Sequence, residues 1–411
     1  MKNKSRTIII LGLMTSLAPF TIDMYLPAFQ AIALEFGTTV SRVSLSLSSY
    51  FIGLSIGQLM YGPLLDRFGR KHPVYAGLSL YILATLFCLW SRTTENLVVW
   101  RFVQAFGGCA VGVASMAMVR DLFTLKESAK VFSLLILILG SSPLLAPTVG
   151  SYLSETFGWS SIFVVLAVFG LLLLLAIRFL LPNSSPPDHV VSLKPRDIIS
   201  TYAGILRNRE FATYAVSGAV AFSGLFVYLA GSPIIFLENL KVSAQAYGVI
   251  FGVVAMGMIV ASQLNVQLIK RYSNHQILLA ALIGQVVTGL VLLIAIGTGH
   301  GGLYEIVVAM FCLMFSFGLV NPNAAAMALA PFAKNAGSAA AMMGFLQMAL
   351  GALASMLVGS LGIKEILPIF GIITSASALA LGIYLKGSQG IAKSKLVSSD
   401  ESLQPVRKSA L

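Results

Sequence analysis

Two ionisable side chains, Asp23 and Arg101, lie well inside long apolar stretches of the sequence. A charge at the centre of a membrane-spanning helix costs roughly 2.5–3.5 kcal/mol on insertion scales, so such residues usually face the protein interior and belong to an ion or proton pathway. A buried carboxyl group can carry a proton, and a guanidinium beside it favours the ionised form. Asp23 and Arg101 are therefore the candidate proton-coupling residues. The alternative is that both lie near a membrane interface, with Arg101 extending its charge to water.

The segment GPLLDRFGRKHP, residues 62–73, combines a Gly-Pro pair, an acid, a second glycine and a basic cluster. The acid ends a predicted helix, the second glycine permits a tight turn, and the basic residues favour the cytoplasmic face of a membrane. A basic anchor alone would explain the charges but not the spacing of the other residues. The pattern therefore predicts a functional loop rather than an anchor.

The segment LGSSPLLAPTVG, residues 139–150, places two prolines four residues apart among small residues. Pro143 and Pro147 lie on one helix face and should bend the helix, because proline removes a backbone hydrogen bond. Small residues such as Gly140 and Gly150 let a neighbouring helix approach closely. An ordinary kinked packing helix is the alternative interpretation.

Aromatic and amide side chains inside the apolar stretches could line a substrate cavity. The same side chains could instead pack in the core, face lipid or hydrogen-bond between helices. The candidates that we select are Tyr25, Tyr50, Gln104, Phe222, Tyr228, Asn323 and Gln347. Gln58 and Asn321 are further amide side chains of this kind.

The composition identifies the environment in which these residues lie. Of the 411 residues, 57% are hydrophobic and 10% are charged, whereas roughly 25% of the residues of a soluble domain are charged. This excludes a soluble globular protein. Cys88, Cys109 and Cys312 all fall in apolar stretches, a placement that predicts neither a disulfide framework nor a metal site. We expect no cofactor, with the proton as coupling ion.

Long apolar runs predict about twelve membrane spans. They cover roughly residues 7–29, 43–65, 73–90, 97–119, 133–152, 161–181, 211–236, 246–269, 276–296, 303–326, 337–361 and 366–385. This pattern predicts an N-terminal six-helix bundle at 1–182 and a C-terminal one at 211–386. A cytoplasmic linker at 183–210 joins them, and a disordered tail follows at 387–411.

The loops predict the orientation of the chain. Alternate loops hold nearly all the Lys and Arg, whereas the other loops hold only Arg42, Arg92, Lys241 and Lys364. Because positive residues near span ends stay in the cytoplasm, both termini are predicted to be cytoplasmic. The net charge of +12 therefore reflects the orientation of the chain in the membrane. We expect no nucleic-acid partner.

An internal repeat suggests how the two halves work together. GQLMYGPLLDRFGRKHPVY, after the second span, has a weaker echo in SQLNVQLIKRYSNHQIL, after the eighth. Duplicated halves of this kind place a substrate site near the bilayer midplane and rock around it.

Several segments together resemble the major facilitator superfamily. Residues 62–73 resemble its signature loop between the second and third helices, RFVQAFGG (101–108) its fourth-helix motif, and residues 139–150 the fifth-helix motif of its antiporters. TIDMYLPAF (21–29), VYLAGSPIIF (227–236) and NPNAAAMALAPF (321–332) are similar to the bicyclomycin-resistance (Bcr/CflA) branch of drug:proton antiporters. The resemblance covers nearly all of residues 7–385. It implies an all-α integral membrane protein with twelve transmembrane helices in two pseudo-symmetric six-helix bundles.

The resemblance also assigns roles to residues. It implies that the 62–73 loop forms a cytoplasmic gate that holds the outward-facing state, and that Arg101 takes part in proton coupling. The gate residues would be Gly62, Asp66, Arg67, Gly69, Arg70 and Lys71. The antiporter-motif residues would be Gly140, Pro143, Pro147 and Gly150. The echo has Arg271 and Ser273 in place of the acid and the glycine, and Thr15 stands where some multidrug relatives carry a second acid. The resemblance therefore does not extend to a second equal gate or to a second carboxylate.

We therefore expect a proton-coupled antiporter that exports small amphiphilic drugs or toxic compounds, with Asp23 as proton carrier. An ion pair with Arg101 would hold this carboxylate ionised, so coupling requires a contact that changes between states. We place the protein in a bacterial inner membrane as a multi-pass monomer. Its expected partners are the lipid bilayer, a small-molecule substrate and protons.

Four other functions are alternatives to drug export, and the sequence favours them to different degrees. Export of an endogenous metabolite, such as a siderophore, amino acid or nucleoside, would use the same scaffold. A nutrient symporter would leave the two prolines without a role. An enzyme would need a nucleophile and base or metal ligands within the spans, and the one match, GLSIG (53–57), lies in a predicted helix without a histidine partner. A channel would not need the repeat or the loop motif.

Overall fold

The computed structural model describes residues 4–182, 193–332 and 336–403, and in this part of the chain the regular elements are all helical. The N-terminal half contains α1 (Lys4–Asp23), α3 (Val40–Phe68), α4 (Lys71–Leu89), α5 (Thr94–Leu122), α6 (Leu125–Phe157) and α7 (Ser160–Phe179). The C-terminal half contains α9 (Arg209–Pro233), α10 (Ala244–Leu268), α11 (Asn274–Gly297), α12 (Leu303–Leu329), α13 (Ala336–Ser360) and α14 (Ile366–Leu403). The shorter elements are η1 (Leu26–Ala28), α2 (Phe29–Glu35), α8 (Pro195–Arg207), η2 (Ile234–Asn239) and η3 (Ala330–Phe332).

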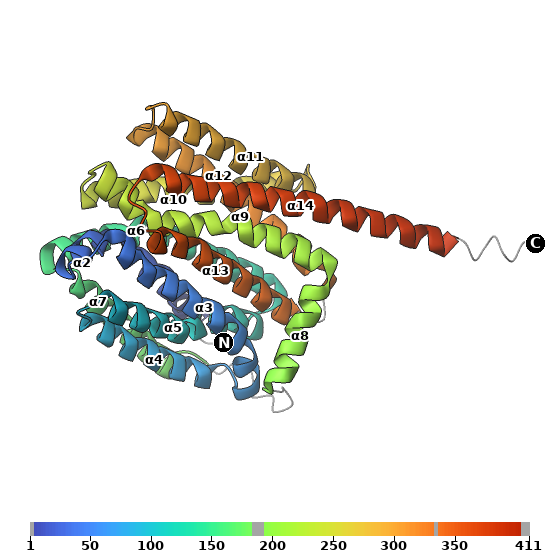
Figure 1. The fold of residues 1–411 in the computed structure, drawn as a ribbon. Coiled ribbons are helices and arrows are strands. Elements are labelled where there is room, and N and C mark those ends of the chain that lie inside the picture. The colour runs from blue at the N-terminus through green and yellow to red at the C-terminus, as the bar shows by residue number, and fades with distance from the viewer. Residues whose placement is uncertain (1–3, 183–192, 333–335, 404–411) are drawn as a thin grey trace, which may run out of the picture.

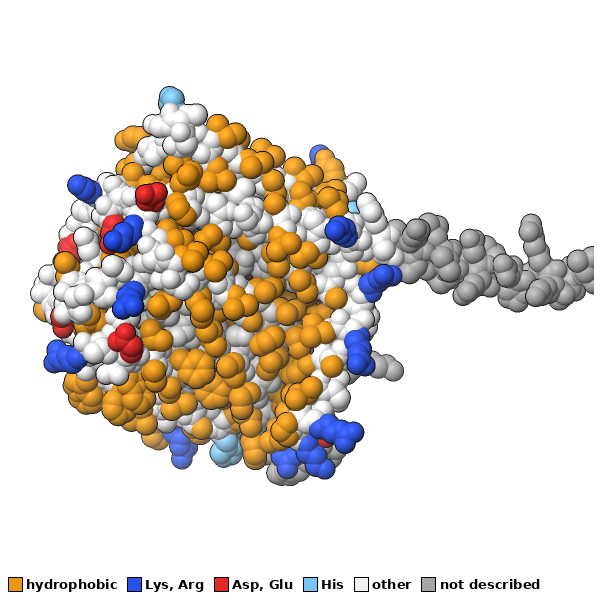
Figure 2. Space-filling view, viewed as in Figure 1, with side chains coloured by type: hydrophobic (Ala, Val, Ile, Leu, Met, Phe, Trp, Pro, Cys, Tyr) orange, Lys and Arg blue, Asp and Glu red, His pale blue; other side chains and the backbone are white. Residues whose placement is uncertain are grey.

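The composition of these helices explains why they form a membrane bundle. Eleven of the described helical segments are long and apolar enough to cross a bilayer, and α6 is a further long helix packed against α1 and α10. Figure 2 shows a broad band of apolar side chains, with Lys, Arg, Asp and Glu gathered at its two ends. This is the distribution that a bilayer selects, because charges are costly in its hydrocarbon core.

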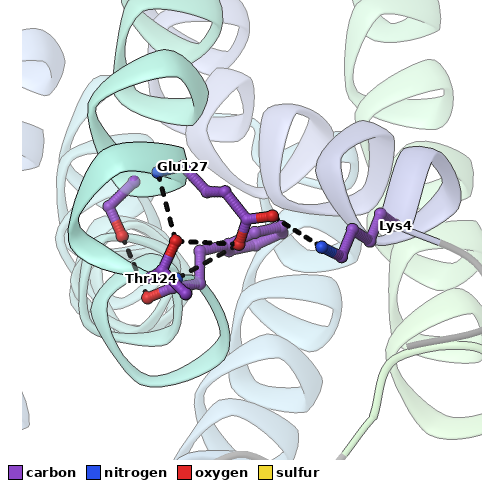
Figure 3. Close-up of polar contacts among 5 residues, drawn as sticks. Lys4, Thr124 and Glu127 are labelled. Carbon is purple, nitrogen blue, oxygen red and sulfur yellow. Dashed lines mark hydrogen bonds and ion pairs between the residues drawn. The ribbon is translucent and has the colours of Figure 1, made fainter.

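Side-chain caps begin several of the helices. Thr124 and Glu127 form a capping box at the start of α6, in which each side chain accepts a hydrogen bond from the other residue's backbone N–H. The Glu127 carboxylate also accepts from Lys4 Nζ at 2.6 Å (Figure 3). The start of α1 is thus fastened to the start of α6.

The chain departs from the sequence-based expectation in three places. The first span, expected at 7–29, breaks after Asp23, and a short 3-10 turn leads into α2. Part of the expected linker 183–210 is the helix α8, which runs across one end of the bundle, while residues 183–192 lie outside the described part (Figure 1).

The third departure is that α14 continues to Leu403 and projects beyond the bundle, although we expected a disordered tail from residue 387 (Figure 1). The sequence has no proline between Pro368 and Pro405 to stop the helix. The extension also packs on the start of α9, where Gly387 lies against Thr213 and Ile391 is buried. Residues 404–411 lie outside the described residues.

Candidate functional site

A cavity of about 1110 Å³ lies between the two halves. Its walls come from α1, α3 and α5 of the N-terminal half, from α13 of the C-terminal half, and from α8. Its charged lining residues, Asp66, Arg70, Arg120, Asp121 and Asp197, lie where α3 and α5 end and α8 begins. We call this the mouth; it is at the same end of the bundle as the start of α1. Farther from the mouth, the lining residues include Thr15, Ile22, Gln58 and Gln347.

At the opposite end the two halves pack tightly, and we call this the closed end. Between α3 and α13, the hydroxyl oxygens of Ser48 and Ser355 lie 2.9 Å apart, and Ser41 Oγ donates to the Val358 carbonyl at 2.7 Å. Between α6 and α10, Ser151 Oγ lies 2.8 Å from the Ala244 carbonyl oxygen. Small and hydroxyl-bearing residues permit this close approach. The structure is therefore open at one end and shut at the other.

Asp23 lies beneath the closed end. It is the last residue of α1, and only 5% of its surface is exposed. Its neighbours on the same helix, Pro19 and Ile22, line the cavity, but Asp23 does not. The segment that follows it, η1, contacts α9 and α10 of the other half. A carboxyl group of the N-terminal half is thus buried at the junction with the C-terminal half.

The antiporter-motif helix α6 shapes this junction directly. A Cβ atom on Gly150 would lie 2.0 Å from the backbone oxygen of Met24, the residue after Asp23. Gly150 is therefore required for α6 to approach the end of α1. Two residues earlier, Thr148 packs against Gly248 of α10. Pro143 and Pro147 both lie inside α6, as predicted. Gly140 also belongs to α6, but its packing is not among the described features.

Arg101 is completely buried in α5. Its Nη1 donates to Gln104 Oε1 at 2.7 Å, and its Nη2 donates to the Thr21 carbonyl at 3.3 Å. Its guanidinium carbon lies 4.5 Å from the ring centre of Tyr25 and 4.3 Å from that of Tyr50, a geometry in which aromatic faces stabilise a cation. Within the described residues, Arg101 has no ion-pair partner, and its Nε has no hydrogen-bond acceptor.

Asp23 and Arg101 thus share a region without sharing an ion pair. Arg101 holds the carbonyl of Thr21, two residues before Asp23. Both side chains are buried, as the sequence-based expectation of two charges inside the protein requires. The alternative, in which Arg101 extends its charge to water, disagrees with this burial. The sequence did not predict that Arg101 stacks on the rings of Tyr25 and Tyr50, because this contact joins segments that are distant in the chain.

The predicted gate loop forms an ion-pair cluster at the mouth. Arg70 lies 2.5 Å from Asp66 and 2.7 Å from Asp121. Burial lowers the pKa of Arg70, but the hydrogen bonds and charges of Asp121 and Asp66 outweigh it and raise this pKa above its ordinary value. Gly69 ends α3 at a φ of 77°, a conformation that favours glycine. Lys71 donates to the Leu181 carbonyl at 2.6 Å, so the loop is tied within the N-terminal half.

Asp121 was absent from the sequence-based candidates. It lies in the last turn of α5, twenty residues after Arg101. The signal in the sequence that could have identified it is an acid next to the basic residue Arg120 at the end of a span. The gate residue Arg67 also lies in this region, at the end of α3. Gly62 lines the cavity with open space where a Cβ would stand.

A further contact joins the linker helix to the gate segment. Tyr202 Oη of α8 donates to the Leu59 carbonyl of α3 at 3.1 Å. In a regular helix this carbonyl would accept from residue 63, but residue 63 is a proline and has no N–H. Burial first, and then the charge of Asp66, raise the pKa of Tyr202, so its hydroxyl keeps the proton that it donates.

Most of the cavity candidates chosen from sequence have other positions. In the described part of the chain, Gln347 lines the cavity, whereas the other six do not. Tyr25, Tyr50 and Gln104 surround Arg101. Phe222 packs on Phe226 and Phe317. Asn323 donates to Asn265 at 2.8 Å, and Tyr228 stacks on Phe251. The four aromatic candidates therefore pack inside the protein rather than line this cavity.

The described residues contain no group of three or more His, Cys, Asp or Glu side chains that could hold a metal ion.

Comparison with known proteins agrees with this architecture. Residues 11–357 match the family model described as Major Facilitator Superfamily. The chain belongs to the major facilitator superfamily, and it is a multi-pass membrane transporter rather than an enzyme.

Three relatives illustrate its position in the family. The chain is 35% identical over 352 residues to the "Uncharacterized MFS-type transporter YdgK" of Bacillus subtilis, covering 85% of this chain and 87% of the relative. It is 30% identical over 361 residues to the "Bicyclomycin resistance protein homolog" of Haemophilus influenzae, covering 88% and 90%. It is 28% identical over 378 residues to the "Multidrug resistance protein MdtL" of Escherichia coli, covering 92% and 94%. The resemblance to the bicyclomycin-resistance branch is thereby confirmed.

A solved structure supports the fold. The crystal structure of a D-xylose-proton symporter matches with a TM-score of 0.73 and 15% identity, covering 92% of this chain and 96% of that one. The predicted all-helical major facilitator fold is confirmed. Because the chain belongs to this transporter superfamily, the partners of the protein include the lipid bilayer and a small-molecule substrate.

Proposed function

We propose that this protein is a proton-coupled antiporter that exports small amphiphilic drugs or toxic compounds from the cytoplasm of a bacterium across its inner membrane. The observation that carries the proposal is the placement of Asp23. A buried carboxyl lies at the closed junction of the two halves, next to a cavity that is open at the other end. The names of two relatives, a bicyclomycin resistance homolog and a multidrug resistance protein, support export of drugs.

The orientation follows from charge. The mouth lies at the end where Lys4, Arg70, Arg120 and Arg178 are found, and positive residues favour the cytoplasmic side. With the mouth in the cytoplasm, the structure is inward-facing. Gly62 of α3 and Gly337 of α13 line the open cavity, and each has free space at its Cβ position. This space lets the two halves approach when the cavity closes on the cytoplasmic side.

Asp23 acts as the proton carrier in this scheme. In the outward-facing state, separation of α6 from α10 exposes the carboxyl to the periplasm, where it takes a proton and substrate leaves. In the inward-facing state the proton is lost to the cytoplasm and substrate binds. Arg101 favours the charged carboxylate when the two groups approach. Because they form no ion pair in the present state, their contact can change between states.

The available free energy is adequate for drug export. A membrane potential of about 100 mV contributes about 2.3 kcal/mol per charge, and one pH unit adds about 1.36 kcal/mol. One proton therefore supports a gradient of roughly several hundredfold for a neutral drug, since each 1.4 kcal/mol is a factor of ten.

Replacing Asp23 by Asn tests the proposal. We expect the variant to fold but to lose drug-triggered proton movement in proteoliposomes with an imposed pH gradient, because an amide cannot carry the proton. The matched control is Glu95→Gln, which removes an exposed carboxylate at the start of α5 and should leave the flux unchanged.

The outcomes separate the alternatives. Full proton-driven export by Asp23→Asn would refute its role. Proton movement triggered only by siderophores, amino acids or nucleosides would assign the protein to metabolite export. Substrate flux without any proton requirement would indicate a channel.

A further inference from the structure

The deep part of the cavity contains a pair of amide side chains with unused hydrogen-bonding capacity. Gln58 of α3 and Gln347 of α13 both line it, so the pair spans the two halves. Gly344 lies one turn before Gln347, and a Cβ atom added to it would be 3.3 Å from Gln58 Oε1. The Gln58 amide therefore lies against α13, the helix that carries Gln347, one turn from that residue.

The hydrogen bonds of these amides are only partly used. Gln347 Nε2 donates to Asn321 Oδ1 at 2.7 Å, an interaction that orients the amide, while no described residue bonds its Oε1. Gln58 has no hydrogen-bond partner among the described residues, although it is half-buried. An amide offers two N–H donors and a carbonyl acceptor. Polar groups in such a position are satisfied by water or by a ligand.

Apart from Thr15, whose hydroxyl already donates to the Leu11 carbonyl at 2.8 Å, the rest of the deep wall is predominantly apolar. Ile22, Leu54, Val113, Met116 and Met348 line it beside the two amides. The charged lining residues of the described chain lie at the mouth, and Asp66 is eight residues from Gln58, about 12 Å along α3. Two of these acids, Asp66 and Asp121, already pair with Arg70.

This arrangement distinguishes between classes of substrate. A permanent cation in the deep cavity would lose its hydration without contacting a carboxylate, because Asp23 is buried and does not line the cavity, and this loss is unfavourable. A neutral molecule with amide and hydroxyl groups would gain donors and acceptors from Gln58 and Gln347 and apolar contact from the rest of the wall.

We propose that Gln58 and Gln347 form the recognition site for a neutral, amide-bearing amphiphile, and that the protein selects such compounds over lipophilic cations. This inference rests on the proposed export function and specifies its substrate class. Exchange of a neutral substrate for a proton moves net charge across the membrane, so an imposed inside-negative potential should accelerate it.

Equilibrium binding to the purified full-length protein in detergent tests the proposal without requiring proton coupling. Isothermal titration calorimetry would compare two neutral amide-bearing probes, chloramphenicol and bicyclomycin, with the permanent cation tetraphenylphosphonium. We expect at least one neutral probe to bind at least about tenfold more tightly than the cation. Gln58→Leu and Gln347→Leu should each weaken neutral binding by roughly five- to tenfold, the value of about one hydrogen bond.

Two further variants separate recognition from folding. Gln285→Leu removes a buried amide of α11 that does not line the cavity, so the affinity for the neutral probes should not change. Gln58→Glu places a carboxylate in the deep wall and should strengthen tetraphenylphosphonium binding by about tenfold while weakening the neutral probes. Such a gain of binding cannot arise from misfolding.

The contrary results are equally defined. Equal or tighter binding of the cation by the wild type, unchanged neutral binding in both Leu variants, or no binding of either neutral probe would overturn the inference. Asp23→Asn should keep the preference for neutral probes. A wild-type protein that shows no preference for neutral probes but has drug-triggered proton flux would refute this site and leave the proposed export function standing.

Discussion

At the scale of single residues, the unusual feature is a buried cation held by rings and neutral acceptors. Arg101 stacks between Tyr25 and Tyr50 and donates to Gln104 and Thr21. A guanidinium suits this position because it is planar and donates in a fixed fork, whereas an ammonium is compact and strongly hydrated. The position therefore requires arginine rather than any positive charge.

Arg101→Lys tests this geometry. We expect the substitution to lower the free energy of unfolding by about 1–3 kcal/mol, because it loses stacking and one hydrogen bond in a buried site. The shift would appear as a lower melting temperature of the purified protein in detergent. Arg92→Lys, at a side chain that is 80% exposed, is the control and should not shift it. Equal melting temperatures for all three proteins would show that the stacking does not stabilise the fold.

At the scale of elements, prolines inside helices create contacts between helices. Pro63 leaves the Leu59 carbonyl of α3 without its helical donor, and Tyr202 of α8 supplies a hydrogen bond instead. The linker helix is thereby tied to the N-terminal half, while its other contacts reach α9 and α13 of the C-terminal half.

A double-mutant cycle tests this contact. Tyr202→Phe should cost about 1 kcal/mol, because the Leu59 carbonyl loses its partner. Pro63→Ala restores an N–H in α3, so the same Tyr202→Phe change should cost less in that background, with a coupling of about 0.5–1 kcal/mol. Thermal unfolding of the four proteins measures the cycle. Strictly additive effects would mean that the hydroxyl and the proline act independently.

At the scale of the whole molecule, the two halves touch firmly at one end and enclose a cavity at the other. Transport by alternating access requires the closed end to open. Ser48 and Ser355, whose hydroxyl oxygens are 2.9 Å apart, mark the place where α3 and α13 must separate.

Cysteines at these two positions test the motion. Ser48→Cys combined with Ser355→Cys, in a protein lacking Cys88, Cys109 and Cys312, should form a disulfide under oxidation because the side chains already meet. We expect the oxidised protein to lose at least nine-tenths of its transport in proteoliposomes, and reductant to restore it. Each single cysteine variant serves as control and should be insensitive to oxidant. Undiminished transport by the cross-linked protein would show that this end does not open.

The sequence by itself determined the class of fold and the location of the gate loop. Membrane insertion depends on local composition, so apolar runs of about 20 residues are readable one at a time, and the loop at 62–73 is contiguous in the chain. The burial of Asp23 and Arg101 could also be predicted, since a charge within an apolar span is too costly to face lipid.

The tertiary structure alone decided which residues meet. The partners of Arg101, the approach of Gly150 to Met24, the addition of Asp121 to the gate cluster and the amide pair in the cavity all join different helices. These contacts depend on how each helix is rotated about its axis and on which end of the molecule is closed. Apolar spans with little polar pattern leave that rotation undefined, because a bilayer accepts any apolar face.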